Sequence, residues 1–151
     1  NYADWNEPGE TPSGSRQAGD LYRKCREKDV PIFVMEPVKG GNLASLSESA
    51  ESILKAQRPD ASMASWALRW VGSLDGVITL NSGMSNLEQV LDNVQTMMDF
   101  EPLSTAEARA IQQTLGKRFP ARIAAIAIPA RTASISPRSS GSTSAMAKQL
   151  A

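Results

Sequence analysis

The fold is decided by the stretch Val77-Ile78-Thr79-Leu80-Asn81-Ser82-Gly83-Met84-Ser85-Asn86-Leu87-Glu88. Its first four residues are a short apolar run rich in β-branched side chains, which predicts a strand. Ser85 to Glu88 has the spacing of a capping box, in which the serine oxygen and the glutamate each satisfy a backbone N–H of a new helix. An apolar stripe continues that helix at Leu87, Val90, Leu91 and Val94. A strand that runs through a short loop into a helix is typical of parallel α/β folds.

A second strand is predicted upstream. Ile32 to Met35 is a continuous apolar run between turn signals, which favours a strand buried on both faces. It leads into Glu36 to Asn42, a loop with two glycines. Helices are predicted around the strands at Arg16 to Lys28, Glu48 to Gln57, Met63 to Leu74 and Ser104 to Gly116, the last with a second capping box. This alternation predicts right-handed βαβ crossovers and a parallel sheet.

The predicted core is too small to complete such a fold. Trp66 and Trp70 fall on the apolar stripe of one helix and are expected to pack in the core, and Cys25 is expected to be a small buried residue. Two strands cannot form a sheet that is covered on both faces. We therefore expect a chain that begins inside a longer protein, has marginal stability and tends to self-associate through uncovered apolar faces.

Composition excludes several classes of site. The chain has no histidine and one cysteine, so histidine-based catalysis, histidine metal sites and an internal disulfide are excluded, and a reducing cytoplasm is expected. No apolar run reaches the roughly 20 residues of a membrane helix. All 16 acidic residues lie in residues 1–116, whereas residues 117–151 hold six basic residues and no acid. We expect a domain boundary between these two regions.

The loop after the first strand, Pro37 to Leu43, is one candidate ligand site. Gly40 and Gly41 would let backbone N–H groups approach a phosphate closely, and Lys39 would add positive charge. A tight turn with a solvated lysine explains the same pattern equally well.

The loop after the second strand, Ser82 to Ser85, is the stronger candidate. It runs directly into a helix start, where backbone donors and the helix dipole favour an anion. Gln89 and Asn93 lie one and two turns beyond Ser85 on the same face, where amides would suit a ribose phosphate and an adenine edge. The alternative is an ordinary capped helix with solvated amides.

Three motifs together resemble the aldo/keto reductase superfamily. They are Met35-Glu36-Pro37-Val38-Lys39-Gly40-Gly41-Asn42-Leu43, Ala64-Ser65-Trp66-Ala67-Leu68-Arg69-Trp70 and Gly76-Val77-Ile78-Thr79-Leu80-Asn81-Ser82-Gly83-Met84-Ser85-Asn86. The resemblance runs from Asn1 to about Leu115. It is closest to a bacterial and archaeal branch that appends a ferredoxin-like [4Fe–4S] segment.

This resemblance implies the C-terminal portion of a (β/α)8 TIM barrel, with strands six to eight and their helices in residues 1–116. Asn1 and Tyr2 would close the sixth strand, Ile32 to Met35 would form the seventh and Val77 to Leu80 the eighth. The family binds NADP(H) in extended form across the carboxyl ends of the strands.

The resemblance also implies a cofactor site. Met35 would lie near the nicotinamide, and the loop from Pro37 to Leu43 would cover the pyrophosphate. The polar set Ser85, Gln89, Asp92 and Asn93 would hold the 2′-phosphate end and adenine. Many members have an arginine where Gln89 stands, and an amide carries no charge, so NAD(H) stays open beside NADP(H). The full expected set is Met35, Pro37, Lys39, Gly40, Gly41, Leu43, Ser82, Gly83, Ser85, Gln89, Asp92 and Asn93.

The family reduces aldehydes and ketones by hydride transfer, with a tyrosine acid supported by aspartate, lysine and usually histidine from the first four strands. No residue of this chain matches that set, and Tyr2 and Tyr22 do not match the catalytic position. The resemblance therefore implies an inactive chain whose partners are the missing N-terminal barrel half and, in the full-length parent, a small carbonyl substrate.

Residues 117–151 depart from the iron–sulfur branch. After Ile128-Pro129, Ala130 and Ala133 stand where that branch has its first two cysteines, so no four-cysteine cluster is possible. A frameshift would explain the alanines and the Ala/Ser/Arg-rich composition. The alternative function is a non-catalytic remnant or a binding module whose basic tail contacts nucleic acid or another acidic partner. Nucleic acid is the less favoured partner, because the tail has no aromatic residue beyond Phe119, and a membrane is not expected.

Overall fold

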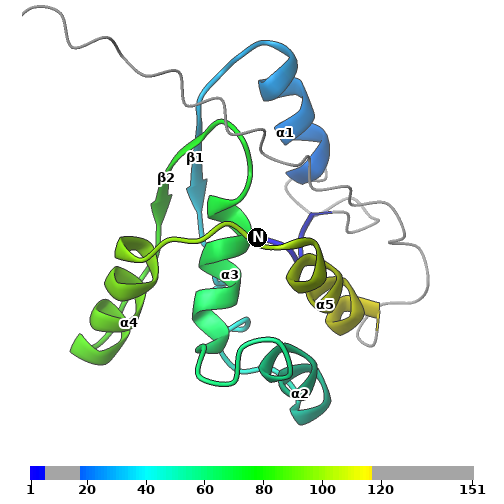
Figure 1. The fold of residues 1–151 in the computed structure, drawn as a ribbon. Helices are drawn as coiled ribbons and strands as arrows, with labels where there is room; N and C mark the ends of the chain where they lie inside the picture. The colour runs from blue at the N-terminus through cyan, green and yellow to red at the C-terminus, as the bar shows by residue number, and fades with distance from the viewer. Residues whose placement is uncertain (6–17, 117–151) are drawn as a thin grey trace, which may run out of the picture.

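The computed structural model describes residues 1–5 and 18–116 of the chain. Within them the chain forms a two-stranded sheet with helices packed on one of its faces (Figure 1). In chain order the elements are α1 (Ala18–Glu27), β1 (Ile32–Met35), α2 (Glu48–Lys55), α3 (Met63–Gly72), β2 (Val77–Asn81), α4 (Leu87–Met98) and α5 (Thr105–Gly116). The predicted helices and strands are confirmed, with ends that shift by a few residues.

The two strands are parallel neighbours, as the alternation of elements predicts. Ile32 lies opposite Val77 and Met35 lies opposite Asn81. Helices α2 and α3 form the crossover between the strands, and α3 packs against β2. Because the carboxyl ends of β1 and β2 are level, the loops that follow them emerge at the same edge of the sheet.

One face of this sheet is exposed, which corrects the prediction that Ile32 to Met35 is buried on both faces. Phe33 and Met35 are 64% and 70% exposed, and Ile78 on β2 is 59% exposed. Val34 and Leu80 face the other way and pack against the core. The burial alternates because helices pack on one side of the strands, whereas no element of the described residues covers the other.

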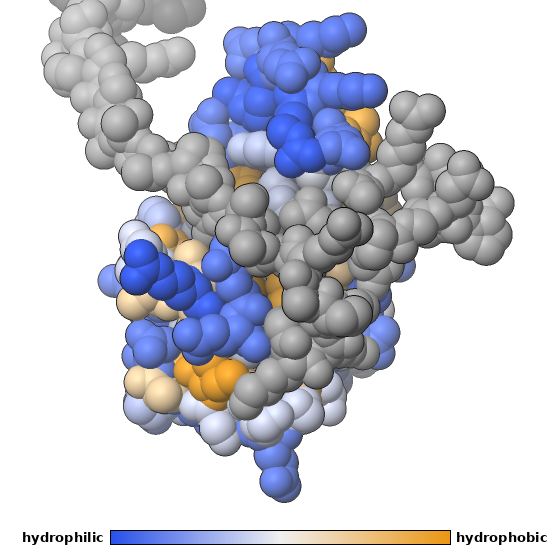
Figure 2. Space-filling model, turned by 90° about the vertical axis from the view of Figure 1, so that its right-hand side faces the viewer, coloured by the Kyte–Doolittle hydropathy of each residue, from blue (hydrophilic) through white to orange (hydrophobic). Residues whose placement is uncertain are grey.

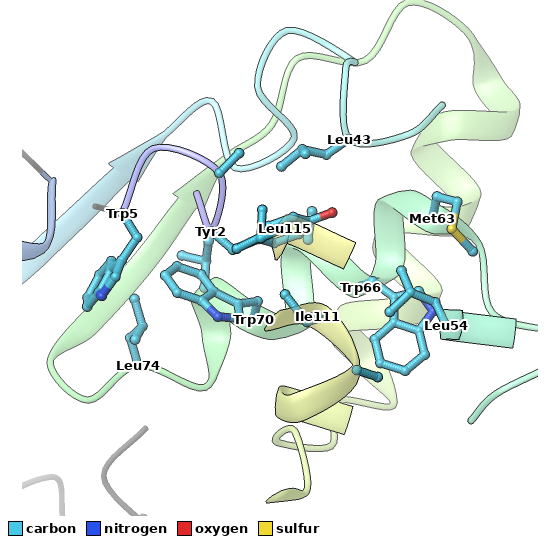
Figure 3. Packing of buried hydrophobic residues seen from close by; sticks show 14 residues of the cluster. Tyr2, Trp5, Leu43, Leu54, Met63, Trp66, Trp70, Leu74, Ile111 and Leu115 are labelled. Atoms are coloured by element: carbon cyan, nitrogen blue, oxygen red, sulfur yellow. The ribbon is translucent and has the colours of Figure 1, made fainter. Parts of the chain in front are cut away.

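The N-terminal segment does not close a sixth strand. Residues 2–5 form turns, and the Asn1 side chain accepts hydrogen bonds from the amides of Ala3 and Asp4 at 3.1 and 3.0 Å. These local bonds satisfy backbone donors that a strand would offer to a neighbour. The segment instead delivers Tyr2 and Trp5 to the core (Figure 3).

Helix α3 is the centre of that core. Trp66 is fully buried and Trp70 is 2% exposed, which confirms their predicted packing role. The ring centroid of Trp70 lies 5.0 Å from that of Trp5 and 6.2 Å from that of Tyr2, both in edge-to-face geometry (Figure 3). Such aromatic pairs add to the stability that comes from burial alone.

Helix α3 also buries a charge. Arg69 is 5% exposed, and its two terminal nitrogens bind the carboxylate oxygens of Glu107 at 2.8 and 3.1 Å. Its Nε donates to the backbone carbonyl of Glu101 at 3.0 Å. Glu107 in turn caps α5, because it accepts from the Ser104 amide while its own amide donates to the Ser104 hydroxyl. The second predicted capping box is therefore confirmed, and it is joined to a buried ion pair.

The apolar stripe of α4 is exposed at Leu87, Leu91 and Val94, in line with the uncovered apolar faces expected from the sequence. One prediction about the core is wrong. Cys25 is half-buried rather than fully buried. In both cases the helix has the expected apolar face, but the described residues supply too few neighbours to cover it. On the side viewed in Figure 2, by contrast, most of the surface that the structure describes is hydrophilic.

Among the helices of the described residues, none combines the length and apolar character that crossing a lipid bilayer requires.

Replacing one partner of the buried ion pair should destabilise the fold strongly. In Glu107→Gln, Arg69 stays buried without a counter-charge, and we expect the free energy of unfolding to fall by roughly 3 kcal/mol. Urea unfolding followed by circular dichroism measures this. The matched control is Glu101→Gln, which removes an exposed carboxylate that pairs with Arg58 and should cost much less. Equal losses in the two variants would contradict the structural role of Glu107.

Stability should also depend on pH through Glu107. Burial by itself would raise the pKa of this carboxyl, but hydrogen bonds from Arg69, the Ser104 backbone and Arg58 outweigh it and lower the pKa from 4.5 to about 2. The folded pKa is thus below the unfolded one, so the contribution of Glu107 is complete above pH 4.5 and is lost as the pH falls toward 2. Unfolding free energies measured across this range should fall less in Glu107→Gln than in the unchanged chain. If the unfolding free energies of the two proteins fell equally over this pH range, the assignment of the pH dependence to Glu107 would be contradicted.

Candidate functional site

The loops that follow β1 and β2 enclose a pocket at the carboxyl edge of the sheet. Its volume is about 250 Å³, and the starts of α3 and α4 complete its wall. Eight residues predicted from the sequence line it, namely Gly40, Gly41, Ser82, Gly83, Ser85, Gln89, Asp92 and Asn93. Val38, Ala44 and Ala64 form the remaining wall. The structure thus brings together residues that lie more than 50 positions apart in the sequence.

Asn86, rather than Ser85, caps helix α4. Its side-chain oxygen accepts a hydrogen bond from the Gln89 amide at 2.9 Å, and the Gln89 side chain accepts from the Ser85 amide at 2.7 Å. The predicted capping box of Ser85 with Glu88 is therefore wrong by one residue. Asparagine and serine are both good N-caps, so the sequence alone did not fix which of the two neighbours ends the loop.

This cap changes what the helix start can bind. The Ser85 and Gln89 backbone N–H groups, two of the donors expected to converge on an anion, already bind side chains. Because its oxygen is occupied, the Gln89 side chain presents its NH₂ group as a donor.

Asn93 and Asp92 sit one turn further along α4 and are held by neighbours. The Asn93 NH₂ group donates to the Ser82 hydroxyl at 3.1 Å, which leaves the Asn93 carbonyl as an acceptor. Asp92 accepts from the Ser62 hydroxyl at 2.7 Å through one carboxylate oxygen. Ser62 is also the N-cap of α3, so this bond joins the start of α3 to the middle of α4.

The glycine loop is shaped by left-handed backbone conformations. Gly40 and Gly41 have φ values of 58° and 90°, and Lys39 has a φ of 51°. The Gly41 amide donates to the Val38 carbonyl within the loop at 3.1 Å. The Gly40 and Gly83 amides make no hydrogen bond with any residue that the structure describes. They are therefore free to donate to a group outside the described residues.

Four predicted site residues lie outside the pocket. Leu43 is 1% exposed and belongs to the hydrophobic core, and Pro37 is also buried. Met35 is at the end of β1 on the exposed face of the sheet. Lys39 does not line the pocket, because its Nζ forms an ion pair with Asp4. The prediction that Leu43 belongs to the cofactor site did not anticipate that its side chain turns inward, away from the loop surface.

The ion pair of Lys39 and Asp4 ties the glycine loop to the N-terminal segment. Burial by itself would raise the pKa of the Asp4 carboxyl, but hydrogen bonds from Lys39 and Asn1 outweigh it and hold that pKa below its ordinary value. The positive charge expected at the phosphate is thus engaged elsewhere. Asp4 was missed because it is 35 residues from Lys39 and no local pattern connects them.

The pocket has one charged lining residue among those the structure describes, the carboxylate of Asp92. No group of histidine, cysteine or acidic side chains that could hold a metal ion occurs within residues 1–5 and 18–116.

A parallel sheet with a ligand pocket between the loops at its carboxyl edge defines the class of α/β proteins that bind small molecules at that edge. Residues 5–115 match the model of the aldo/keto reductase family. The chain belongs to that family.

One similar solved structure is the aldo-keto reductase AKR11C1 from Bacillus halodurans in its holo form. It shares 27% sequence identity and a TM-score of 0.51 with this chain. The match covers 66% of this chain and 38% of that one. The chain therefore spans well under half of the length of that relative. None of the curated proteins compared with it matches.

The position of the α4 cap is testable. Asn86→Ala removes the side chain that satisfies the Gln89 amide and should lower the free energy of unfolding by about 1 kcal/mol. Ser85→Ala, the matched control one residue earlier, should change it much less, because the described cap does not use the Ser85 hydroxyl. Both are measured by urea unfolding. If Ser85→Ala lost more unfolding free energy than Asn86→Ala, the result would contradict this cap and favour the capping box of Ser85 with Glu88.

Proposed function

We propose that the pocket binds the adenosine end of a nicotinamide dinucleotide, NADP(H) or NAD(H). The chain would supply this cofactor-binding part to an oxidoreductase that reduces carbonyl compounds. The observation that carries the proposal is the convergence of eight predicted residues, from two loops and helix α4, on one pocket. Membership of the aldo/keto reductase family supports a redox reaction of this kind.

The pocket fits a nucleoside in size and in polarity. Sites that hold an entire small molecule usually have about 300–1,000 Å³, so the 250 Å³ found here suits one end of a dinucleotide. An adenine edge offers a donor at its amino group and an acceptor at the adjacent ring nitrogen. The NH₂ group of Gln89 can donate to the ring nitrogen, and the carbonyl of Asn93 can accept from the amino group.

The rest of the dinucleotide would follow the carboxyl edge of the sheet. Gly40 and Gly83 have open space where a side chain would lie, so a phosphate can approach their backbone N–H groups. Met35 lies beyond them at the end of β1, on the face exposed in this chain. Its exposure is compatible with a nicotinamide ring held partly by other polypeptide.

Hydride transfer needs residues beyond those of this chain. The sequence has no histidine, and Tyr2 is 2% exposed inside the core, where it cannot meet a substrate. The proposal is that the chain binds the cofactor and that carbonyl reduction takes place only together with further polypeptide. The holo neighbour, which is longer than the matched region, is consistent with this division.

The exposed apolar surfaces also support the proposal that further polypeptide completes the enzyme. Phe33 and Ile78 on the sheet, with Leu87 and Leu91 on α4, would be covered by further strand–helix units of a barrel. We propose those units as the partner and the cytoplasm as the location.

Kinship with the [4Fe–4S] branch also stays a proposal, since residues 117–151 lie outside the described part. A single cysteine cannot supply the four thiolates of such a cluster.

Filling the pocket should abolish nucleotide binding. Gly83→Leu places a side chain in open space without a left-handed φ at that residue, so the fold should tolerate it while the pocket closes. We expect 5′-ADP to shift amide NMR signals of Ser82, Gln89 and Asn93 in the unchanged chain and not in the variant.

The matched control is Gln57→Leu, which adds leucine at an exposed position outside the pocket and should leave binding unchanged. Shifts that survive in Gly83→Leu, or that map to the cavity between α2 and α5, would refute the assignment of the pocket.

A further inference from the structure

We infer that this pocket selects an adenosine with a free ribose 2′-hydroxyl and rejects one that carries a 2′-phosphate. The inference rests on the proposed function, because it concerns the same adenosine site. It assigns the cofactor as NAD(H) rather than NADP(H), and it makes Asp92 the residue that determines specificity.

The charge of the pocket is the first reason. Asp92 is the one charged residue among the described residues that line it, and it is half-buried. A 2′-phosphate carries close to two negative charges, and proteins hold such groups with arginine, lysine or several backbone donors. Beside a partly desolvated carboxylate the two like charges repel. The negative charge of Asp92 thus disfavours binding of the 2′-phosphate, the group that distinguishes NADP(H) from NAD(H).

The nearest basic residue in these loops cannot reverse that repulsion without breaking another contact. Lys39 lies in the glycine loop, yet its Nζ is held by Asp4 and its side chain does not line the pocket. Moving Lys39 toward a phosphate would leave the partly buried Asp4 carboxylate without its cation. The lysine charge of this loop is therefore committed to the ion pair, and the loop can offer an anion only its backbone N–H groups.

The start of α4 has two backbone donors that are already engaged. The Ser85 and Gln89 amides are bound by the side chains of Gln89 and Asn86 at 2.7 and 2.9 Å. A phosphate that took its hydrogen bonds from these two amides would have to displace both contacts. A hydroxyl group makes no such demand, because it needs one donor or one acceptor.

Asp92 is placed to accept that hydroxyl. One of its oxygens is bound by Ser62 at 2.7 Å, which fixes the carboxylate against the start of α3. The other oxygen makes no hydrogen bond within the described part of the chain and remains an acceptor. A carboxylate that accepts from the ribose 2′-hydroxyl is a general way in which dinucleotide sites favour NAD over NADP.

The test compares two probes that differ only by the 2′-phosphate, 5′-AMP and adenosine 2′,5′-bisphosphate, on the complete 151-residue chain. Dissociation constants are measured by NMR titration. We expect 5′-AMP to bind at least roughly tenfold more tightly. Asp92→Asn should narrow this ratio, and Gln89→Arg should reverse it by adding a cation at the pocket rim. Glu88→Gln removes an equal charge from an exposed position outside the pocket and should leave the ratio unchanged.

Equal or tighter binding of the bisphosphate to the unchanged chain would overturn the inference and leave the proposed nucleotide site intact. The same holds if Glu88→Gln shifts the ratio as far as Asp92→Asn, since the effect would then come from overall charge. If neither probe binds, the proposed function fails and the inference fails with it.

Discussion

The buried ion pair between Arg69 and Glu107 is the constraint on which the rest of the structure depends. Arg69 projects from α3 at a point where every residue from Ser65 to Val71 is buried. A guanidinium at that depth is tolerated only when a counter-charge and further acceptors surround it. Glu107 supplies the charge and the Glu101 backbone supplies a carbonyl. Glu101 lies in the segment that joins α4 to α5 and Glu107 lies in the first turn of α5, so α3 cannot pack as it does unless both follow.

The same helix links this constraint to the pocket. At the N-terminal end of α3, Ala64 lines the pocket. Ser62, the N-cap, donates a hydrogen bond to Asp92, which also lines the pocket. The middle of α3 carries Arg69 and the tryptophans of the core. Because one helix carries both residues, the packing of Arg69 also fixes the position of Ala64 in the pocket wall. Binding and folding are therefore supported by one element, although the residues that serve each are distinct.

Much of this arrangement could be predicted from the sequence, for specific physical reasons. Apolar periodicity located α3 and both strands, and the level ends of parallel strands explain why Gly40 and Ser82 meet at one pocket. Contacts that depend on distant residues could not be predicted. Nothing near Lys39 indicates that Asp4 holds it, and nothing near Asp92 indicates Ser62. The exposure of Phe33 was also missed, since an apolar run has the same pattern whether its neighbours are present or not.

The most direct test of the account is where adenosine lies when it is bound. Isotope-filtered NOEs between 5′-AMP and the labelled chain report which side chains are within about 5 Å of the ligand protons. We predict contacts from the ligand to the methyl groups of Ala44 and Ala64, which line the pocket. Contacts instead to Leu46 and Ala50, in the cavity between α2 and α5, would contradict the central claim that the strand-end loops form the nucleotide site.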